Sequence, residues 1–331
     1  MRPEDVDEAA ALLAARHRRD RQRLPVLARA LEGAPGCRKV VEGQLKAPFA
    51  AGVVAQRSGK AAGFMVGQTM TLSPDHFASQ FIPPHSAQVG VEGHAVAAGE
   101  DVTAVYRAMY AELAGRWVKS GFFVHRAHIV PGDLEAQEAW VSLGFGRHLT
   151  AAVRLTATPA PQTREADVEI HRAGAEDIDV VMQLADTLAL HHTLSPMFWP
   201  YLHTTDAAAR AVNLAALEAN EIPYFIGYQG GRPAGAQTFL KPGFTPSIVE
   251  QEGNVYLFEG IVNPDVRSGG VGTALLAHSM AWARDHGFET CGLHFASGNF
   301  SGAPFWLGHG FVPVEYTMER RVDERIAWAN R

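Results

Sequence analysis

The stretch VNPDVRSGGVGTALLAHSMAWARDHGF, residues 262–288, carries the pattern that decides the fold. It follows an apolar run at 255–262 that predicts a strand, which a Pro-Asp pair ends. The glycine-rich turn 267–272 comes next. An amphipathic pattern then predicts a helix to about His286, with Gly287 as its stop. Glycines let the backbone approach a ligand closely, and a helix N-terminus favours negative charge. This order of elements therefore predicts a pyrophosphate site.

The spacing of this turn, Arg-x-x-Gly-x-Gly at 267–272, narrows the kind of ligand. It differs from the Gly-x-x-x-x-Gly-Lys-Ser/Thr pattern of nucleotide hydrolases and from the Gly-x-Gly-x-x-Gly pattern of dinucleotide folds. Placed five residues after Val262, it resembles the coenzyme A loop of the GNAT superfamily of N-acetyltransferases. The alternative for so short a motif is an ordinary strand-to-helix turn.

Two further matches favour the GNAT resemblance, which extends over residues 167–322. A predicted strand at 293–295 is followed by Asn299, and the segment 303–311 closes on Gly-Phe. The resemblance implies an α/β (α+β) fold with a central mixed, mostly antiparallel sheet, flanking helices and one splayed strand pair. It also implies acetyl-CoA as cosubstrate.

Composition bounds the class of protein. The chain has 331 residues, 47% of them hydrophobic and 19% charged, as in soluble globular proteins of two ordinary domains. The net charge of −6 shows no excess of positive charge of the kind that favours nucleic-acid binding. No apolar run is long enough for a membrane span, and the acidic N-terminus is unlike a signal peptide. Two cysteines make no disulfide framework, so we expect a cytoplasmic, reducing compartment.

The two halves of the chain repeat the same landmarks. Three pairs lie 166 residues apart, namely Gly121 and Gly287, Trp140 and Trp306, Gly144 and Gly310. The turn sequences at 57–63 and 229–235 each predict a hairpin, so Ser58-Gly-Lys60 is a turn and not a nucleotide loop. We therefore predict two GNAT-like domains, at 1–155 and 167–331, joined by a proline-punctuated linker at 156–166.

The first copy lacks the cofactor loop. Opposite residues 267–272 it has Asp101-Val-Thr-Ala-Val-Tyr106, without a glycine. The acidic side chains of Glu100 and Asp101 would repel pyrophosphate, and the bulky residues would block close backbone approach. The N-terminal domain is therefore predicted to be degenerate, with a structural or substrate-shaping role.

Acetyl transfer to an amine needs a polarised carbonyl, removal of a proton from the ammonium, and a stabilised leaving thiolate. The resemblance implies that the strands carrying Val262 and His294 splay apart around the pantetheine arm, and that the Val262 backbone N–H holds the acetyl carbonyl. Strand parity gives Glu259 and His294 as base candidates. The first copy keeps Glu92 and His128 at corresponding places, so the alternative for both candidates is a structural role.

Trp306 departs from the family pattern. Many GNAT enzymes carry a tyrosine four residues before the closing glycine, and an indole N–H does not usefully protonate a thiolate. One alternative is that another donor, such as Tyr316 or a water, is the general acid. A second is that the thiolate leaves without assistance. A third alternative is an acyl-CoA-binding regulatory or scaffold protein without rapid turnover.

The resemblance implies cofactor contacts from Ile261, Val262, Arg267, Ser268, Gly269, Gly270, Val271, Gly272, Asn299 and Trp306. We expect the acceptor to be a small-molecule primary amine, with a peptide or protein amine as second choice. No metal is expected, because the histidines at 191, 192 and 203 fit no ligand spacing. The aromatic loop 197–201 either stacks on the acceptor or caps the core. We expect a monomer or a homodimer that binds neither nucleic acid nor membrane.

Overall fold

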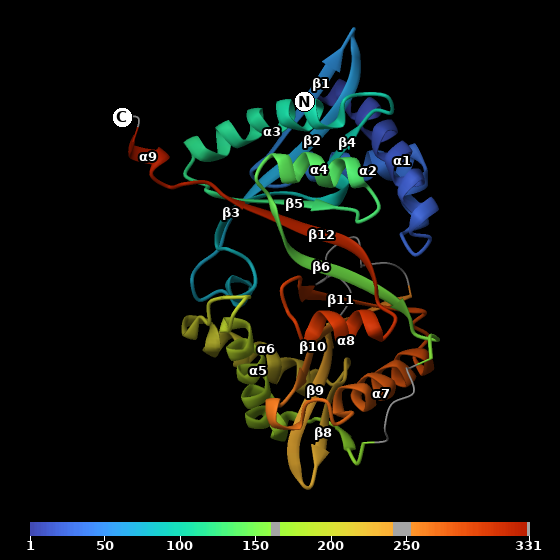
Figure 1. Cartoon of the computed structure of the whole chain (residues 1–331), viewed down its shortest axis with the longest axis vertical. Helices are drawn as coiled ribbons and strands as arrows, with labels where there is room; N and C mark the ends of the chain where they lie inside the picture. Colours follow the sequence, from blue (N-terminus) through green and yellow to red (C-terminus); the bar gives the residue numbers. More distant parts are fainter. Residues whose placement is uncertain (160–165, 241–252, 330–331) are drawn as a thin grey trace. The chain divides into compact units, whose positions relative to one another are not determined.

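The computed structural model describes residues 1–159, 166–240 and 253–329 (Figure 1). Residues 160–165 of the predicted linker lie outside this range. The chain forms two compact units, and each is described by itself. The first unit consists of residues 1–73, 83–150 and 314–331, and the second of residues 74–82 and 151–313. In both, helices flank strands of mixed direction, which confirms the predicted fold class.

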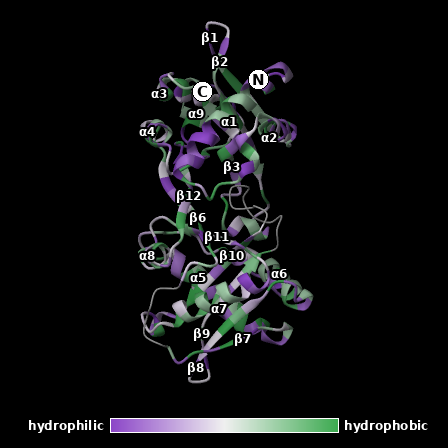
Figure 2. Ribbon diagram, turned by 90° about the vertical axis from the view of Figure 1, so that its right-hand side faces the viewer, coloured by the Kyte–Doolittle hydropathy of each residue, from purple (hydrophilic) through white to green (hydrophobic). Residues whose placement is uncertain are grey.

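The first unit has helices on a mixed sheet with the strand order β1-β2-β3-β5-β12, and β4 pairs with β2. Figure 2 shows that its helices mix hydrophilic and hydrophobic residues, as helices with one buried face do. Its elements are α1 (Val6–Arg23), α2 (Ala34–Lys46), β1 (Ala50–Arg57), β2 (Lys60–Thr71), β3 (His85–Val89), β4 (His94–Val96), α3 (Val102–Lys119), β5 (Val124–Ile129), α4 (Leu134–Ser142), β12 (Val312–Arg321) and α9 (Ile326–Ala329).

The second unit repeats this plan with the strand order β6-β11-β10-β9-β8-β7. The apolar residues of β10, β11 and α7 share one core cluster, and those of α5, β8 and β9 share another. Its elements are the 3₁₀ turn η3 (Phe77–Gln80), β6 (Gly146–Leu155), β7 (Glu169–Arg172), α5 (Ile178–Thr193), α6 (Asp206–Ala219), β8 (Tyr224–Gln229), β9 (Arg232–Leu240), β10 (Asn254–Val262), α7 (Val271–Asp285), β11 (Thr290–Ala296) and α8 (Gly302–Gly308).

The repeated Gly-Phe landmarks are helix C-terminal caps. In each, the glycine after the helix has φ between 80° and 85°, and the phenylalanine N–H donates to the carbonyl five residues back. This is the Schellman arrangement, in which glycine tolerates the left-handed conformation without steric cost. It ends α3, α4, α7 and α8 at Gly121, Gly144, Gly287 and Gly310. The constant spacing of 166 residues therefore reflects two pairs of equivalent helix ends, one of each pair in each half of the chain.

Both predicted hairpins are present. Ser58 and Gly59 join β1 to β2 with φ of 52° and 76°, and Gly230 and Gly231 join β8 to β9 with φ of 56° and 73°. Two successive positive φ values give the turn whose twist matches the flanking strands.

The compact units differ from the predicted domains at three places. β12, predicted in the C-terminal domain, pairs with β5 of the first unit over Tyr316–Arg321. β6 is divided between the units at residue 150, and residues 74–82 belong to the second unit. A repeat in sequence shows that each half has a final strand. It does not show which sheet that strand joins, because pairing depends on contacts distant in the chain.

Candidate active site

The glycine-rich turn lies between β10 and α7, as predicted. The 3₁₀ turn η7 (Pro264–Val266) follows β10, and α7 begins at Val271 with Gly270 as its N-cap. Gly270 has φ of 89° and Ser268 has φ of 63°. The left-handed region is open to glycine and strained for most other residues. The first N–H groups of α7 have no partner within the helix, so this turn presents them toward a ligand.

Gly272 and Arg267 hold the turn against the end of β10. A Cβ at Gly272 would lie 3.3 Å from the Phe305 ring and 3.3 Å from Cγ2 of Val262. The Nε of Arg267 donates to the Val262 carbonyl at 3.1 Å. These contacts fix the helix N-terminus close to the strand end, where the predicted acetyl-binding residue lies.

Two other predicted cofactor contacts, Ile261 and Val271, have buried side chains, and a third, Gly269, uses its N–H within the turn. Ile261 and Val271 are buried in the cores on opposite faces of the sheet, and Gly269 donates its N–H to the Val266 carbonyl at 3.4 Å. A ligand at the turn would therefore meet backbone groups of Ile261 and Val271.

β10 and β11 splay apart, which confirms that prediction. They pair in parallel from Asn254↔Thr290 to Tyr256↔Gly292 and no further. β10 nevertheless continues to Val262, where its other edge is still paired with β9. β11 runs on to Ala296. The facing edges of both strands thus present backbone polar groups to an extended ligand, as an unpaired sheet edge does.

A β-bulge determines where Glu259 points. The register of β10 on β9 shifts between Leu257 and Glu259, which leaves Phe258 as the extra residue. Leu257 packs in the core with α7, whereas Ile261 packs in the core with α5. The bulge therefore reverses the alternation of the strand and turns Glu259 toward the α5 face.

Glu259 has the environment of a general base. Burial raises its pKa to about 7, and its Oε2 has no hydrogen-bond partner among the described residues. Tyr224 on β8 and Glu259 on β10 both stand opposite Thr238 of β9. Burial and then the Glu259 charge raise the pKa of Tyr224 well above its usual value. A carboxyl with a pKa near neutrality can take up a proton at physiological pH.

His294 lies on the same face of the sheet but not in the same pocket. Its neighbours Leu293 and Phe295 pack toward α7, so the side chain of His294 points to the opposite face. Its Nδ1 makes a 2.8 Å hydrogen bond with the hydroxyl of Tyr256, a residue that had no signal in the sequence. The role of His294 as a base stays a prediction.

Asn299 and Trp306 both have structural contacts. The Oδ1 of Asn299 accepts the backbone N–H of Ser301 at 3.1 Å and of Gly302 at 2.8 Å, at the start of α8. The Trp306 ring lies against Gly260 of β10, where a Cβ would approach it to 2.7 Å. Their contact with a cofactor stays a prediction.

Tyr316 belongs to the first unit. It lies on β12 opposite Ile129 of β5, and the Arg147 guanidinium lies 4.5 Å above its ring. Tyr316, predicted to lie in the domain that contains the glycine-rich turn, instead belongs to the first compact unit, so the predicted domain is corrected at this residue. Its role as a general acid has no support from contacts within the second unit.

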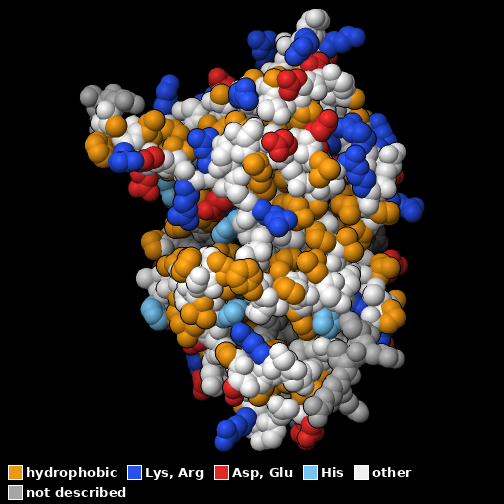
Figure 3. All heavy atoms as spheres, viewed as in Figure 1, with side chains coloured by type: hydrophobic (Ala, Val, Ile, Leu, Met, Phe, Trp, Pro, Cys, Tyr) orange, Lys and Arg blue, Asp and Glu red, His pale blue; other side chains and the backbone are white. Residues whose placement is uncertain are grey.

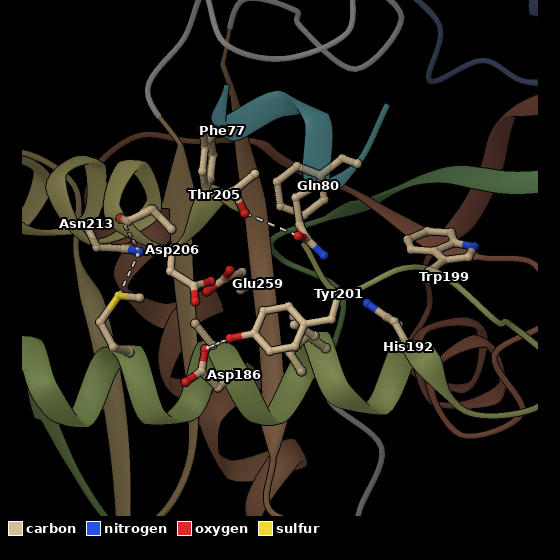
Figure 4. Close-up of a pocket in the computed structure, with 16 residues that line it drawn as sticks. Phe77, Gln80, Asp186, His192, Trp199, Tyr201, Thr205, Asp206, Asn213 and Glu259 are labelled. Carbon is tan, nitrogen blue, oxygen red and sulfur yellow. Dashed lines mark hydrogen bonds between the residues drawn. The ribbon is translucent and has the colours of Figure 1, made fainter. Parts of the chain in front are cut away.

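A pocket on the α5 face of the second unit contains Glu259 (Figure 4). Its walls come from η3, from α5 and α6, and from the aromatic loop, with Phe77, Gln80, Asp186, Trp199, Tyr201 and Asp206 among the lining residues. The loop therefore contributes to a pocket wall, and its stacking on an acceptor stays a prediction. The contribution of η3 from the N-terminal half had no signal in the sequence.

Gln80 of η3 holds the aromatic loop in place. Its Nε2 donates to the Pro200 carbonyl at 3.0 Å, and its Oε1 accepts from the Leu202 N–H at 3.1 Å. Thr204 adds a 2.8 Å hydrogen bond to the Pro74 carbonyl. A short segment of the N-terminal half thus shapes the pocket of the second unit.

In the first unit, a side chain bridges the gap that corresponds to the splay between β10 and β11. β3 pairs with β5 in parallel as far as Val89, and the chain then continues into β4, which pairs with β2. The Nε2 of His94 donates to the His128 carbonyl at 2.9 Å, and its Nδ1 accepts from the Tyr106 hydroxyl at 2.6 Å. Burial lowers the pKa of His94 to about 3, so it bridges as a neutral ring.

The remaining polar counterparts in the first unit also have internal partners. The Asp101 side chain accepts the Ala104 N–H at 3.0 Å and so caps α3 with its own carboxylate. His128 lies 2.6 Å from the Glu315 carboxyl, and Glu92 is buried. These contacts support the prediction that the first unit has lost cofactor binding.

No group of three or more His, Cys, Asp or Glu side chains is placed to hold a metal within the ranges that the structure describes. His191 makes long hydrogen bonds to Ser301 and Asn299, and His192 lines the pocket. Among the described helices, none has the length and apolar character of a membrane span.

Residues 188–311 match the model of the acetyltransferase (GNAT) family. No curated protein matches the sequence. A GCN5-related N-acetyltransferase from Sphaerobacter thermophilus is 14% identical, with 97% of this chain and 93% of that chain covered at a TM-score of 0.59. A fungal protein described as a GCN5-related glucosamine N-acetyltransferase region in a multi-domain β-N-acetylglucosaminidase is 12% identical, with 96% and 37% covered at 0.54. At these identities the likeness shows a shared fold.

Proposed function

We propose, on the premise that this chain belongs to the GNAT acetyltransferase family through residues 188–311, that its second unit transfers the acetyl group of acetyl-CoA to a primary amine of a small molecule. A peptide or protein amine is the second choice of acceptor. Both cysteines are free and buried, which agrees with the proposed cytoplasmic location.

The observation that carries this proposal is the arrangement around β10. The open edge of the strand faces β11, the glycine-rich turn with the α7 N-terminus follows its end, and Glu259 points from it into a pocket. An extended thioester with a pyrophosphate fits the first two features, because unpaired backbone groups and a helix N-terminus complement it. The pocket then accommodates the second substrate.

Each residue has a defined part in the reaction. Acetyl-CoA supplies the activated thioester. Glu259 accepts a proton from the ammonium, directly or through water, and the neutral nitrogen attacks the thioester carbonyl carbon as the carbon–sulfur bond breaks. The nitrogen then loses its second proton to water or to the departing thiolate, which leaves the neutral amide. The proposed role of the Val262 N–H is to stabilise the carbonyl oxygen, as a preorganised donor does. Trp306 supplies no proton, so the thiolate leaves unassisted or takes its proton from water.

A competing function is acyl-CoA binding without rapid turnover. The indole of Trp306, buried against Gly260 where a tyrosine is usual, favours it. The test is thiol release from acetyl-CoA across a library of primary amines. Release that depends on a particular amine supports the transferase. Acetyl-CoA binding without amine-dependent release supports the regulatory alternative.

The stoichiometry of binding is expected to be one acetyl-CoA per chain. Within the part of the chain that the structure describes, the second unit alone combines an open strand edge with a glycine turn, whereas His94 and Asp101 occupy the equivalent places in the first. Isothermal titration calorimetry measures the ratio. Two equivalent sites would contradict the degenerate first unit.

A further inference from the structure

The pocket of Glu259 is acidic at more than one position. Asp186, Asp206 and Glu259 line it, and its described lining contains no lysine or arginine. His192 adds no charge, because burial lowers its pKa to about 4. Figure 3 shows a group of Lys and Arg side chains over α1 of the first unit, with others spread over the rest of this face. The lining thus favours a ligand with positive charge.

Asp186 and Asp206 form an acidic end distinct from Glu259. The Tyr201 hydroxyl donates to Asp186 at 2.7 Å, and both aspartates raise the pKa of Tyr201, after burial as the first cause. The pKa of Glu259, in contrast, is raised by burial and not by repulsion from the aspartates. The Nδ1 of His203, whose side chain is largely exposed, lies 3.2 Å from the Asp206 carboxyl. This end therefore offers two carboxyl groups around one hydroxyl.

Aromatic rings line the same pocket. Phe77 of η3 and Phe81, which directly follows η3, pack edge to face at 5.4 Å, and Trp199 lies 4.9 Å from the His192 ring. Figure 4 shows Tyr201 and Trp199 on the loop side and Phe77 on the η3 side. Such rings attract cations by their faces and pack against methylene chains.

We infer that the acceptor is a dicationic amine, in which a primary amine reacts at Glu259 while a second ammonium is held by Asp186 and Asp206. This inference rests on the proposed transferase activity and narrows its substrate class. The buried Oε2 of Glu259, without a partner among the described residues, marks the reacting end. The aromatic rings accommodate the aliphatic chain that joins the two nitrogens.

The test compares α,ω-diaminoalkanes of increasing length with n-alkylamines of the same length, with thiol release as readout. We expect the best diamine to exceed its matched monoamine in kcat/KM by at least about tenfold, as a charged hydrogen bond contributes. Asp186→Asn keeps an acceptor for Tyr201 but removes a charge, and should lower kcat/KM for diamines far more than for monoamines, so that most of the preference is lost.

Asp179→Asn is the matched control. Asp179 lies on the same helix, is 84% exposed and pairs with Arg210 at 2.8 Å, so its loss should leave the preference unchanged. Equal kcat/KM for diamines and monoamines, or an equal loss for both in Asp186→Asn, would overturn the inference. If no amine is acetylated, the proposed function fails. Calorimetry with the same amines then decides the inference by itself, through diamine binding that Asp186→Asn weakens or through no difference between the two series.

Discussion

Gly270→Asp is expected to abolish acetyl-CoA binding, with an affinity loss of at least about 100-fold, because a carboxylate beside the pyrophosphate site costs several kcal/mol. The first unit already shows this arrangement, since Asp101 caps α3 there and uses the helix N-terminus for its own side chain. Isothermal titration calorimetry with acetyl-CoA measures the loss.

Gly270→Ala is the control that separates the effect of the added charge on acetyl-CoA binding from the effect of backbone strain. Gly270 has φ of 89°, so either substitution should cost about 1–2 kcal/mol of folding free energy and lower Tm by a few degrees. Alanine adds no charge and should retain measurable binding. A folded Gly270→Asp protein with unchanged affinity would place the phosphate site elsewhere.

Glu259→Gln is expected to lower kcat by about 100-fold or more, with acetyl-CoA affinity unchanged, because glutamine does not accept the ammonium proton. The pKa of Glu259 is raised to about 7, so the carboxyl is protonated and inactive below that pH. Wild-type kcat should therefore fall as the pH drops through about 7. The glutamine variant should lack this acidic limb.

His294→Ala distinguishes the two base candidates. His294 bonds Tyr256 and does not line the pocket, so its loss should affect stability more than the acidic limb of the pH profile. Thermal melting of both variants must accompany the kinetics. A stable, fully active Glu259→Gln enzyme would show that the proton leaves by another route.

The sequence predicted the features that depend on short stretches of chain. The glycine turn at 267–272, the strand before it and the helix after it form within about 30 residues, so local patterns specify them. The Gly-Phe caps and both hairpins have the same origin, because each requires a particular residue at a positive φ. The loss of the loop in the first copy was equally visible, as Asp101 stands where the turn would be.

The tertiary structure decided how these pieces make a site. The bulge at Phe258 reverses the alternation of β10, which strand parity does not reveal, and so directs Glu259 into the pocket. η3 joins the second unit through contacts of Gln80 with the loop more than 100 residues away. β12 joins the sheet of the first unit by pairing with β5. The local sequence determines the conformation of a segment. The strands and loops that the segment contacts depend on packing and hydrogen bonding between residues distant in the chain.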